Sequence, residues 1–227
     1  MNSPLCILNF HGIGAPHADV DEDEARYWVT QTQFERCLDQ AVVHKSAGGQ
    51  IKITFDDGNR SDLEIACPAL AARGLRGHFF ILTGRLDDPR YLSPDDVRAL
   101  ETQNMQIGLH GMAHVDWRQA DAAGLHLEVN AARDRLSELT RHPIDTVGLP
   151  FGGYNKRVIG HLKRAGFKRI YTSDGGHAGS GRLLQHRTSV QAHMGSAEIE
   201  AILKNDETLA TKGKRALKSW LKANVIG

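Results

Sequence analysis

Ile51-Lys52-Ile53-Thr54-Phe55-Asp56-Asp57-Gly58 is an alternating, β-branched stretch that ends on two adjacent carboxylates and a glycine. The alternation predicts a strand over residues 51–55. Gly58 allows a sharp turn directly after it. Neighbouring side chains of a continuing strand point to opposite faces, so the strand must end here if both carboxylates are to share one site. The stretch therefore predicts a strand that delivers two carboxylates at its carboxyl end.

Short apolar strands alternate with helical patterns along most of the chain. The predicted strands are Leu5–Phe10, Ile51–Phe55, Gly77–Leu82, Gln106–Leu109, Thr146–Leu149, Arg169–Thr172 and Leu183–His186. The predicted helices cover residues 32–44, 62–73, a segment that Ser93 and Pro94 open, 121–140, 156–165 and the tail from Ala197 on. This order implies parallel strands joined by right-handed crossovers. About seven strands favour an α/β barrel, with an open doubly wound sheet as the alternative.

The bulk properties describe one domain without an obvious polyanionic partner. The chain has 227 residues with 28 Lys and Arg against 27 Asp and Glu, which does not indicate nucleic acid binding. No repeat or linker divides it, so we expect one catalytic domain over residues 1–227 with a helical tail at about 195–227. Three scattered cysteines, no basic leader and no integral membrane segment of ~20 apolar residues favour a cytoplasmic protein. The oligomeric state is not indicated.

A second motif, His110-Gly111-Met112-Ala113-His114, directly follows a predicted strand. Two further polar clusters, Pro150 to Tyr154 and Ser173-Asp174, also follow strands. Catalytic groups of barrel folds gather at these carboxyl ends. Two neutral imidazoles and one carboxylate form a common catalytic site for a divalent metal, and a second carboxylate can accept a proton from water. The alternative is a polar turn and a pair of helix-capping histidines.

Together, TFDDG at 54–58, His-x-x-x-His at 110–114 and Pro-aromatic-Gly at 150–152 resemble the polysaccharide deacetylase family. This domain is shared with chitooligosaccharide and peptidoglycan deacetylases, carbohydrate esterase family four, and the resemblance covers roughly residues 5 to 190. It implies a distorted (β/α)7 barrel that removes acetyl groups from N-acetylated sugars. The expected cofactor is a divalent metal, Zn²⁺ first, with Co²⁺, Ni²⁺ or Mn²⁺ as alternatives. By resemblance, Asp56 is the catalytic base, and the metal ligands are Asp57, His110 and His114.

The third family motif, Arg-x-Pro-Tyr-Gly, reads Gly148-Leu149-Pro150-Phe151-Gly152 in this chain. By resemblance, the backbone N–H of Phe151 is the oxyanion donor, a role that needs no hydroxyl. The arginine that orients the catalytic Asp in the family is replaced by Gly148. We expect Arg187 to substitute for it, because Arg187-Thr188-Ser189-Val190 resembles a later Arg-x-x-Val segment of some branches. The alternative is a surface arginine.

Leu184-Gln185-His186 matches the fifth family motif, Leu-x-His, so the resemblance assigns His186 as the general acid, with His193 as a weaker candidate. Asp174 resembles the fourth motif loosely and would hold an imidazole by a hydrogen bond, unless it is only a turn residue.

Three further residues are expected in the substrate cleft. His11 ends the first strand, Pro150 belongs to the third motif, and Trp117 could stack on a sugar ring unless it is a buried aromatic. The acidic run at 19–24 is expected to be a solvated loop. A basic, amphipathic segment at 212–222 is expected to be a packed surface helix, with an anionic partner or lipid surface as the alternative.

The sequence therefore predicts a metal-dependent carbohydrate N-deacetylase, a hydrolase of a non-peptide C–N bond. Its expected partner is an acetylated carbohydrate: an acetamido-sugar-containing poly- or oligosaccharide or a precursor. A cytoplasmic oligosaccharide or activated sugar is favoured over an exported polymer. One alternative is hydrolysis of a cyclic amide or ureide. The other is a sugar-binding homologue impaired in catalysis, which the missing motif arginine favours.

Overall fold

Eight parallel strands in one sheet form the centre of the protein. The computed structural model describes residues 4–18, 20–179 and 181–224. The strands are β1 (Leu5–Phe10), β2 (Gln50–Phe55), β3 (Gly77–Leu82), β4 (Gln106–Gly111), β5 (Thr146–Gly148), β6 (Arg169–Thr172), β7 (Leu184–His186) and β8 (Thr188–Ser189). They are hydrogen-bonded in the order β7-β6-β5-β4-β3-β2-β1-β8.

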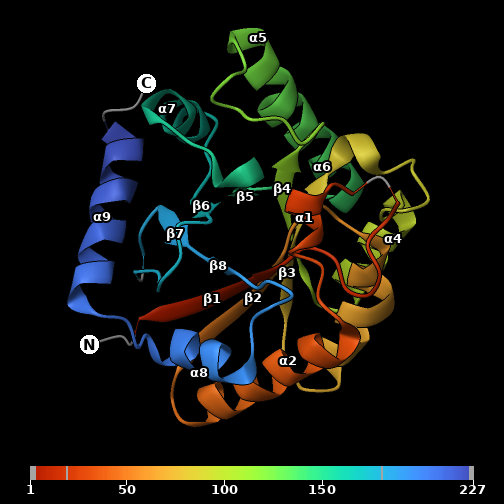
Figure 1. Ribbon diagram of the computed structural model, residues 1–227. Helices are drawn as coiled ribbons and strands as arrows, with labels where there is room; N and C mark the ends of the chain where they lie inside the picture. The colour runs from red at the N-terminus through yellow and green to blue at the C-terminus, as the bar shows by residue number, and fades with distance from the viewer. Residues whose placement is uncertain (1–3, 19, 180, 225–227) are drawn as a thin grey trace.

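The two edge strands of this sheet follow each other directly in the chain. β7 pairs with β6, β8 pairs with β1, and Arg187 alone lies between β7 and β8. One extended segment thus reaches both edges, so the sheet is a nearly closed barrel surrounded by helices (Figure 1). The predicted barrel is confirmed and the open sheet is excluded. β8 was not predicted, because two residues are too short to form a pattern.

Helices cover the outside of the barrel (Figure 1). They are α1 (Glu22–Ala25), α2 (Gln31–Ser46), α3 (Cys67–Ala71), α4 (Pro94–Thr102), α5 (Ala122–Leu125), α6 (Ala132–Thr140), α7 (Lys156–Arg164), α8 (Ser196–Lys204) and α9 (Leu209–Asn224). The π-helical segments η1 (Asp62–Ala66) and η3 (His126–Ala131) lead directly into α3 and α6. Ser93 caps α4 in a capping box with Asp96, as its position before Pro94 predicts.

The C-terminal tail forms two helices rather than one. α8 packs against α2, and α9 packs against α7 (Figure 1). Within the described residues, no helix is long and apolar enough to cross a membrane. The packing of α9 agrees with a surface helix, whereas its alternative as a contact for an anionic surface stays a prediction.

Alternation along the strands divides side chains between the outer core and the barrel interior. On β2, Ile53 and Phe55 pack in the main hydrophobic cluster beneath the helices, while Thr54 bonds to residues of the interior. A smaller apolar cluster, formed by Ile7, Phe80, Tyr171 and Ala178, fills the middle of the interior. We call this cluster the apolar plug.

Two glycines make room for the largest ring of the plug. A Cβ on Gly108 would lie 2.6 Å from the Phe80 ring, and one on Gly148 would lie 3.0 Å from it. Polar layers lie on both sides of the plug, one at the carboxyl ends of the strands and one at their amino ends. The upper layer contains the two carboxylates that the sequence singled out.

Candidate metal centre and active site

Asp56, directly after β2, is a buried carboxylate held from two sides. Arg187 donates from Nη1 to Oδ1 at 2.7 Å and from Nη2 to Oδ2 at 2.8 Å. Asn9 donates from Nδ2 to Oδ2 at 3.1 Å. Burial raises the pKa of Asp56, but the charge of Arg187, the nearby His110 and His11 and the Arg187 hydrogen bonds together hold this pKa below its usual value. The bidentate pair fixes the carboxylate as an oriented anion.

Arg187 is fully buried, which excludes the alternative of a surface arginine. Its Nε donates to the carbonyl of Thr172 at 3.2 Å, and its guanidinium lies 5.2 Å from the centre of the Phe80 ring. A Cβ on Gly148 would lie 3.2 Å from Oδ1 of Asp56. Gly148, the position of the missing motif arginine, thus borders the Asp56 carboxylate. Arg187 reaches the same carboxylate from its place between β7 and β8, where the barrel closes.

Asp57, His110 and His114 converge next to this pair. Asp57 Oδ1 lies 3.4 Å from Nε2 of His110 and 3.5 Å from Nε2 of His114. One ligand atom from each residue lies within 4.8 Å of the others. Asp57 Oδ1 is buried and has no hydrogen-bond partner among the described residues. An unsatisfied carboxylate oxygen that faces two imidazoles suits a divalent cation, so this donor set fits a metal.

The surroundings of both imidazoles favour metal binding through Nε2. His110 Nδ1 lies 3.0 Å from the carbonyl oxygen of Gly148, an acceptor that requires the proton on Nδ1. His114 Nδ1 lies 3.6 Å from Oε1 of Glu24. Burial lowers the pKa of His114 to about 4, which keeps this imidazole neutral near pH 7. Burial also lowers the pKa of His110, but the neighbouring Asp56 and Asp57 raise this pKa by more than burial lowers it. The net shift of the His110 pKa is therefore upward.

Backbone conformations that are rare outside glycine gather at this site. Asp57, His114 and Phe151 have φ values of 76°, 56° and 55°. Left-handed backbone costs non-glycine residues free energy, so the surrounding structure must hold it. Such strain is common where side chains are positioned for function.

Glu128 holds the loop that carries His114, and sequence reasoning did not identify it. Its buried carboxylate accepts hydrogen bonds from the backbone N–H groups of Met112 and Ala113, at 3.0 and 3.1 Å. Trp117 donates to the same carboxylate from Nε1 at 3.3 Å and is fully buried, so it does not face a substrate. Glu128 lies in a helical pattern, where a glutamate is normally exposed. Asn9 was also missed, although a polar residue in an apolar strand is a signal for it.

A cavity of about 390 Å³ opens over Asp56 and the three candidate ligands. His11 and Tyr27 line it with their rings 4.8 Å apart. Phe151 lines it too, with 59% of its surface exposed and its ring 4.3 Å from that of His114. Pro150 is buried and begins the turn before Phe151, without lining the cavity. The volume falls within the range of small-molecule sites.

Asp21, Glu22 and Asp23 of the acidic run are exposed, as a solvated segment predicts, but the run forms a short helix rather than a loop. Asp21 caps the short helix α1, and Asp21, Asp23 and Glu24 line the cavity. Asp19, the first residue of the run, lies outside the described residues.

His186 and Asp174 form a separate cluster away from the cavity wall. Asp174 accepts from the Tyr154 hydroxyl at 2.6 Å and from Lys222 Nζ at 2.7 Å, and His186 Nδ1 lies 3.6 Å from it. Because Arg187 points into the barrel, the neighbouring His186 points the other way. The structure therefore does not bring His186 or Asp174 to the metal set, and His193 does not line the cavity either.

Comparisons with known proteins indicate the family and the fold of the chain. A family model described as polysaccharide deacetylase matches residues 44–170. YxkH of Bacillus subtilis, whose polysaccharide deacetylase designation is provisional, is 21% identical over 213 residues, covering 88% of this chain and 76% of YxkH.

Two solved structures share the fold. The deacetylase PplD of Streptococcus pyogenes in complex with acetate has a TM-score of 0.76 at 19% identity, covering 92% of this chain and 100% of PplD. A de-N-acetylase from Aggregatibacter actinomycetemcomitans has a TM-score of 0.72 at 14% identity, covering 88% of this chain and 100% of that one.

Proposed function

The chain belongs to the polysaccharide deacetylase family, and we propose that it is a metal-dependent hydrolase that removes N-acetyl groups from an acetamido-sugar-containing poly- or oligosaccharide or precursor. One observation carries the proposal. The oriented carboxylate of Asp56 stands beside the convergent donors Asp57, His110 and His114 in one cavity. Metal-assisted hydrolysis of an amide combines a cation that polarises the carbonyl and acidifies water with a group that accepts the proton from that water, and this cavity offers both.

We propose Zn²⁺ at Asp57, His110 and His114, with Co²⁺, Ni²⁺ or Mn²⁺ as alternatives for the same donors. When bound, such an ion polarises an amide carbonyl and lowers the pKa of water. The buried, unpartnered Oδ1 of Asp57 supports this assignment.

Asp56 is proposed as the proton acceptor. Arg187 and Asn9 hold it as an oriented anion, and its depressed pKa makes it a weak base. A weak base accepts a proton only from acidified water, which explains why Asp56 adjoins the cation site. In this proposal Arg187 performs the orienting role of the missing motif arginine.

Phe151 is proposed to act through its backbone and its ring. Its N–H has no acceptor within the described part of the chain, and its left-handed conformation belongs to the turn that Pro150 begins. We propose that this N–H donates to the acetamide oxygen as negative charge develops there. The exposed ring, next to His114, offers an apolar surface for a sugar ring.

We propose His11 as the donor of the proton that the leaving amine requires. Its Nε2 lies 4.0 Å from Oδ2 of Asp56, and burial lowers its pKa, so it starts neutral. The proton taken from water by Asp56 can pass to His11 Nε2 and then to the amine nitrogen as the C–N bond breaks. His186, with Asp174 as its partner, remains the alternative donor.

The relatives' names support the reaction class, since one is a deacetylase with bound acetate and another a de-N-acetylase. The buried pairing of Arg187 with Asp56 removes the main argument for a sugar-binding homologue impaired in catalysis. Three unpaired, buried cysteines favour a reducing compartment, and we propose the cytoplasm.

Acetate release tests the function directly. Purified protein is assayed on chito-oligomers, soluble acetamido sugars and cyclic ureides, with metal analysis before and after chelation. We expect acetate from at least one acetamido sugar, loss on chelation and recovery with Zn²⁺. Ureide hydrolysis without acetate release would favour the cyclic-amide alternative, and activity that survives complete metal removal contradicts the mechanism.

A further inference from the structure

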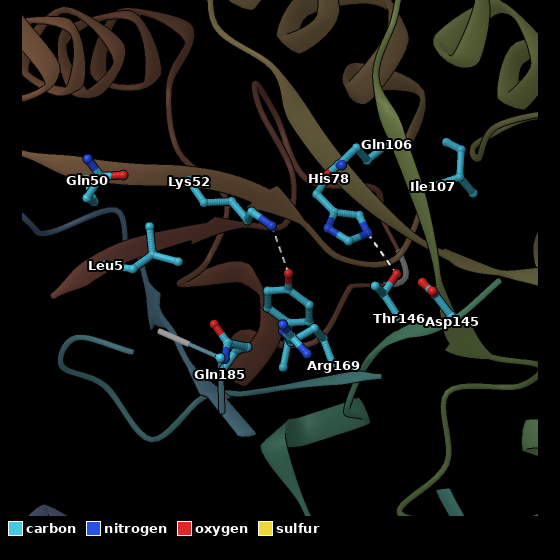
Figure 2. A pocket seen from close by; sticks show the side chains of 12 residues that line it. Leu5, Gln50, Lys52, His78, Gln106, Ile107, Asp145, Thr146, Arg169 and Gln185 are labelled. Atoms are coloured by element: carbon cyan, nitrogen blue, oxygen red, sulfur yellow. Dashed lines mark hydrogen bonds between the residues drawn. The ribbon is translucent and has the colours of Figure 1, made fainter. Parts of the chain in front are cut away.

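A second cavity, of about 510 Å³, is lined by residues that include Lys52, His78 and Arg169 (Figure 2). It lies at the amino ends of the strands, the base of the barrel, whereas Asp56 follows the carboxyl end of β2. The first residues of five strands line it: Leu5, Gln50, Gln106, Thr146 and Arg169. It shares no lining residue with the cavity over the candidate metal centre. The apolar plug lies between the two, so this base cavity is a separate site.

Two cations line the base cavity without a carboxylate partner among the described residues. Lys52 donates from Nζ to the Tyr171 hydroxyl at 2.9 Å, which leaves two of its three N–H groups free (Figure 2). Arg169 donates from Nη1 to the carbonyl of Lys168 at 2.7 Å and keeps most of its guanidinium donors. Both side chains are half-buried. Partly desolvated cations of this kind favour an anionic ligand.

The other polar groups of the wall do not neutralise this charge. Asp145, the one carboxylate of the lining, pairs with Lys168 at 2.8 Å. His78 Nε2 shares a hydrogen bond with the Thr146 hydroxyl at 2.9 Å (Figure 2). Burial first, and then the charge of Lys52, lowers the pKa of His78 to about 3, so this imidazole is neutral near pH 7. The cavity therefore has a net positive wall with neutral hydrogen-bonding groups.

We propose that the base cavity binds a small molecule that carries an oxyanion, a phosphate or a carboxylate, through Lys52 and Arg169. The planar guanidinium of Arg169 can donate to two oxygens at once, and Lys52 adds a compact charge. The volume is sufficient for a metabolite-sized ligand. The site is independent of the proposed deacetylation, because it uses none of the residues over the candidate metal centre.

Calorimetric titration with inorganic phosphate, and separately with citrate, at constant ionic strength tests the proposal. We expect the wild-type protein to bind at least one probe at a single site. Lys52→Met and Arg169→Met should each weaken binding about tenfold or more. Asp145→Asn should tighten it, because it removes the one carboxylate of the wall. The tighter probe distinguishes a phosphate ligand from a carboxylate ligand.

Control variants distinguish binding in the base cavity from binding elsewhere on the protein. Asp57→Ala removes a candidate metal ligand. A probe bound to a metal at the active site would lose its binding site in this variant, whereas a probe bound in the base cavity should keep its affinity. Lys156→Met removes an exposed lysine of α7 and should also change nothing. Lys52→Arg keeps the positive charge, and its affinity for the probe should lie within a few-fold of that of the wild type. This result would show that the weaker binding of Lys52→Met comes from the lost charge and not from a folding defect. Absence of heat with both probes, or loss of binding in Asp57→Ala, overturns the proposal.

Discussion

The two ends of the barrel interior are built by the same strands and differ in how their charges are compensated. At the carboxyl end, Asp56 and Arg187 are both buried and satisfy each other through two hydrogen bonds. At the amino end, Lys52 and Arg169 donate hydrogen bonds to neutral oxygens, and neither pairs with a carboxylate of the described residues. A polar interior layer is thus no sign of catalysis by itself. The upper end combines an oriented anion with convergent metal donors, and the base offers uncompensated positive charge.

The largest expected effect concerns the donor set of the upper end. Asp57→Ala should abolish metal binding and lower kcat on the order of 10⁴-fold, because the remaining imidazoles cannot hold the ion alone. Metal content and acetate release measure both. Asp134→Ala, at an exposed position of α6, is the matched control. An Asp57→Ala protein that keeps its metal and its turnover contradicts the assignment.

Breaking the ion pair of the upper end should cost stability as well as activity. Arg187→Met leaves the Asp56 carboxylate buried without its partner and should lower the free energy of unfolding by about 3–5 kcal/mol. The double variant Arg187→Met with Asp56→Asn should regain part of that stability in urea titrations and stay inactive. If the double variant is no more stable than the single one, the pair is not the source of the loss.

Substitutions of His11 and His186 compare the cavity over Asp56 with the His186–Asp174 cluster beside α9 as the source of the proton for the leaving amine. His11→Gln should lower kcat about 100-fold with little change in KM, because His11 borders Asp56 in the cavity. His186→Gln should change kcat less than about threefold, since the contacts of His186 to Asp174 and to the Thr172 hydroxyl lie outside the cavity. Steady-state kinetics on one acetamido sugar compares them. The reverse ranking would restore His186 as the proton donor.

The last prediction concerns the base of the barrel and depends on pH. His78 is neutral in both the folded and the unfolded chain at a pH above the ordinary histidine pKa of about 6.5. Between that pH and the folded pKa of about 3, the unfolded chain binds a proton at His78 and the folded chain does not. The free energy of unfolding should therefore fall as pH drops, by up to about 1.4 kcal/mol per unit from this residue.

Urea titrations between pH 7 and 4 measure that slope. His78→Gln should be less sensitive to acid than wild type, and His126→Gln, at an exposed histidine, should match wild type. Equal slopes in His78→Gln and wild type contradict a buried, neutral His78.

Much of the barrel was predictable because strand patterns are local. The strands at 5–10, 77–82 and 169–172 have the predicted bounds, since β-branched residues and turn glycines act over a few neighbours. β8 escaped prediction because its pairing with β1 depends on closure of the barrel. The predicted helix at 121–140 appears as α5, η3 and α6, since hydrophobic period does not distinguish α-helical from π-helical turns.

The sequence by itself determined the chemistry of the upper end: which carboxylates and imidazoles follow which strands. Tertiary structure alone decided three things: that Arg187 reaches Asp56, that His186 points away from the cavity and that Trp117 is buried. Arg187 and Asp56 are 131 residues apart, so their contact depends on barrel closure and strand register. Side-chain period specifies alternate faces of a strand, but only the closed barrel decides which face becomes the interior.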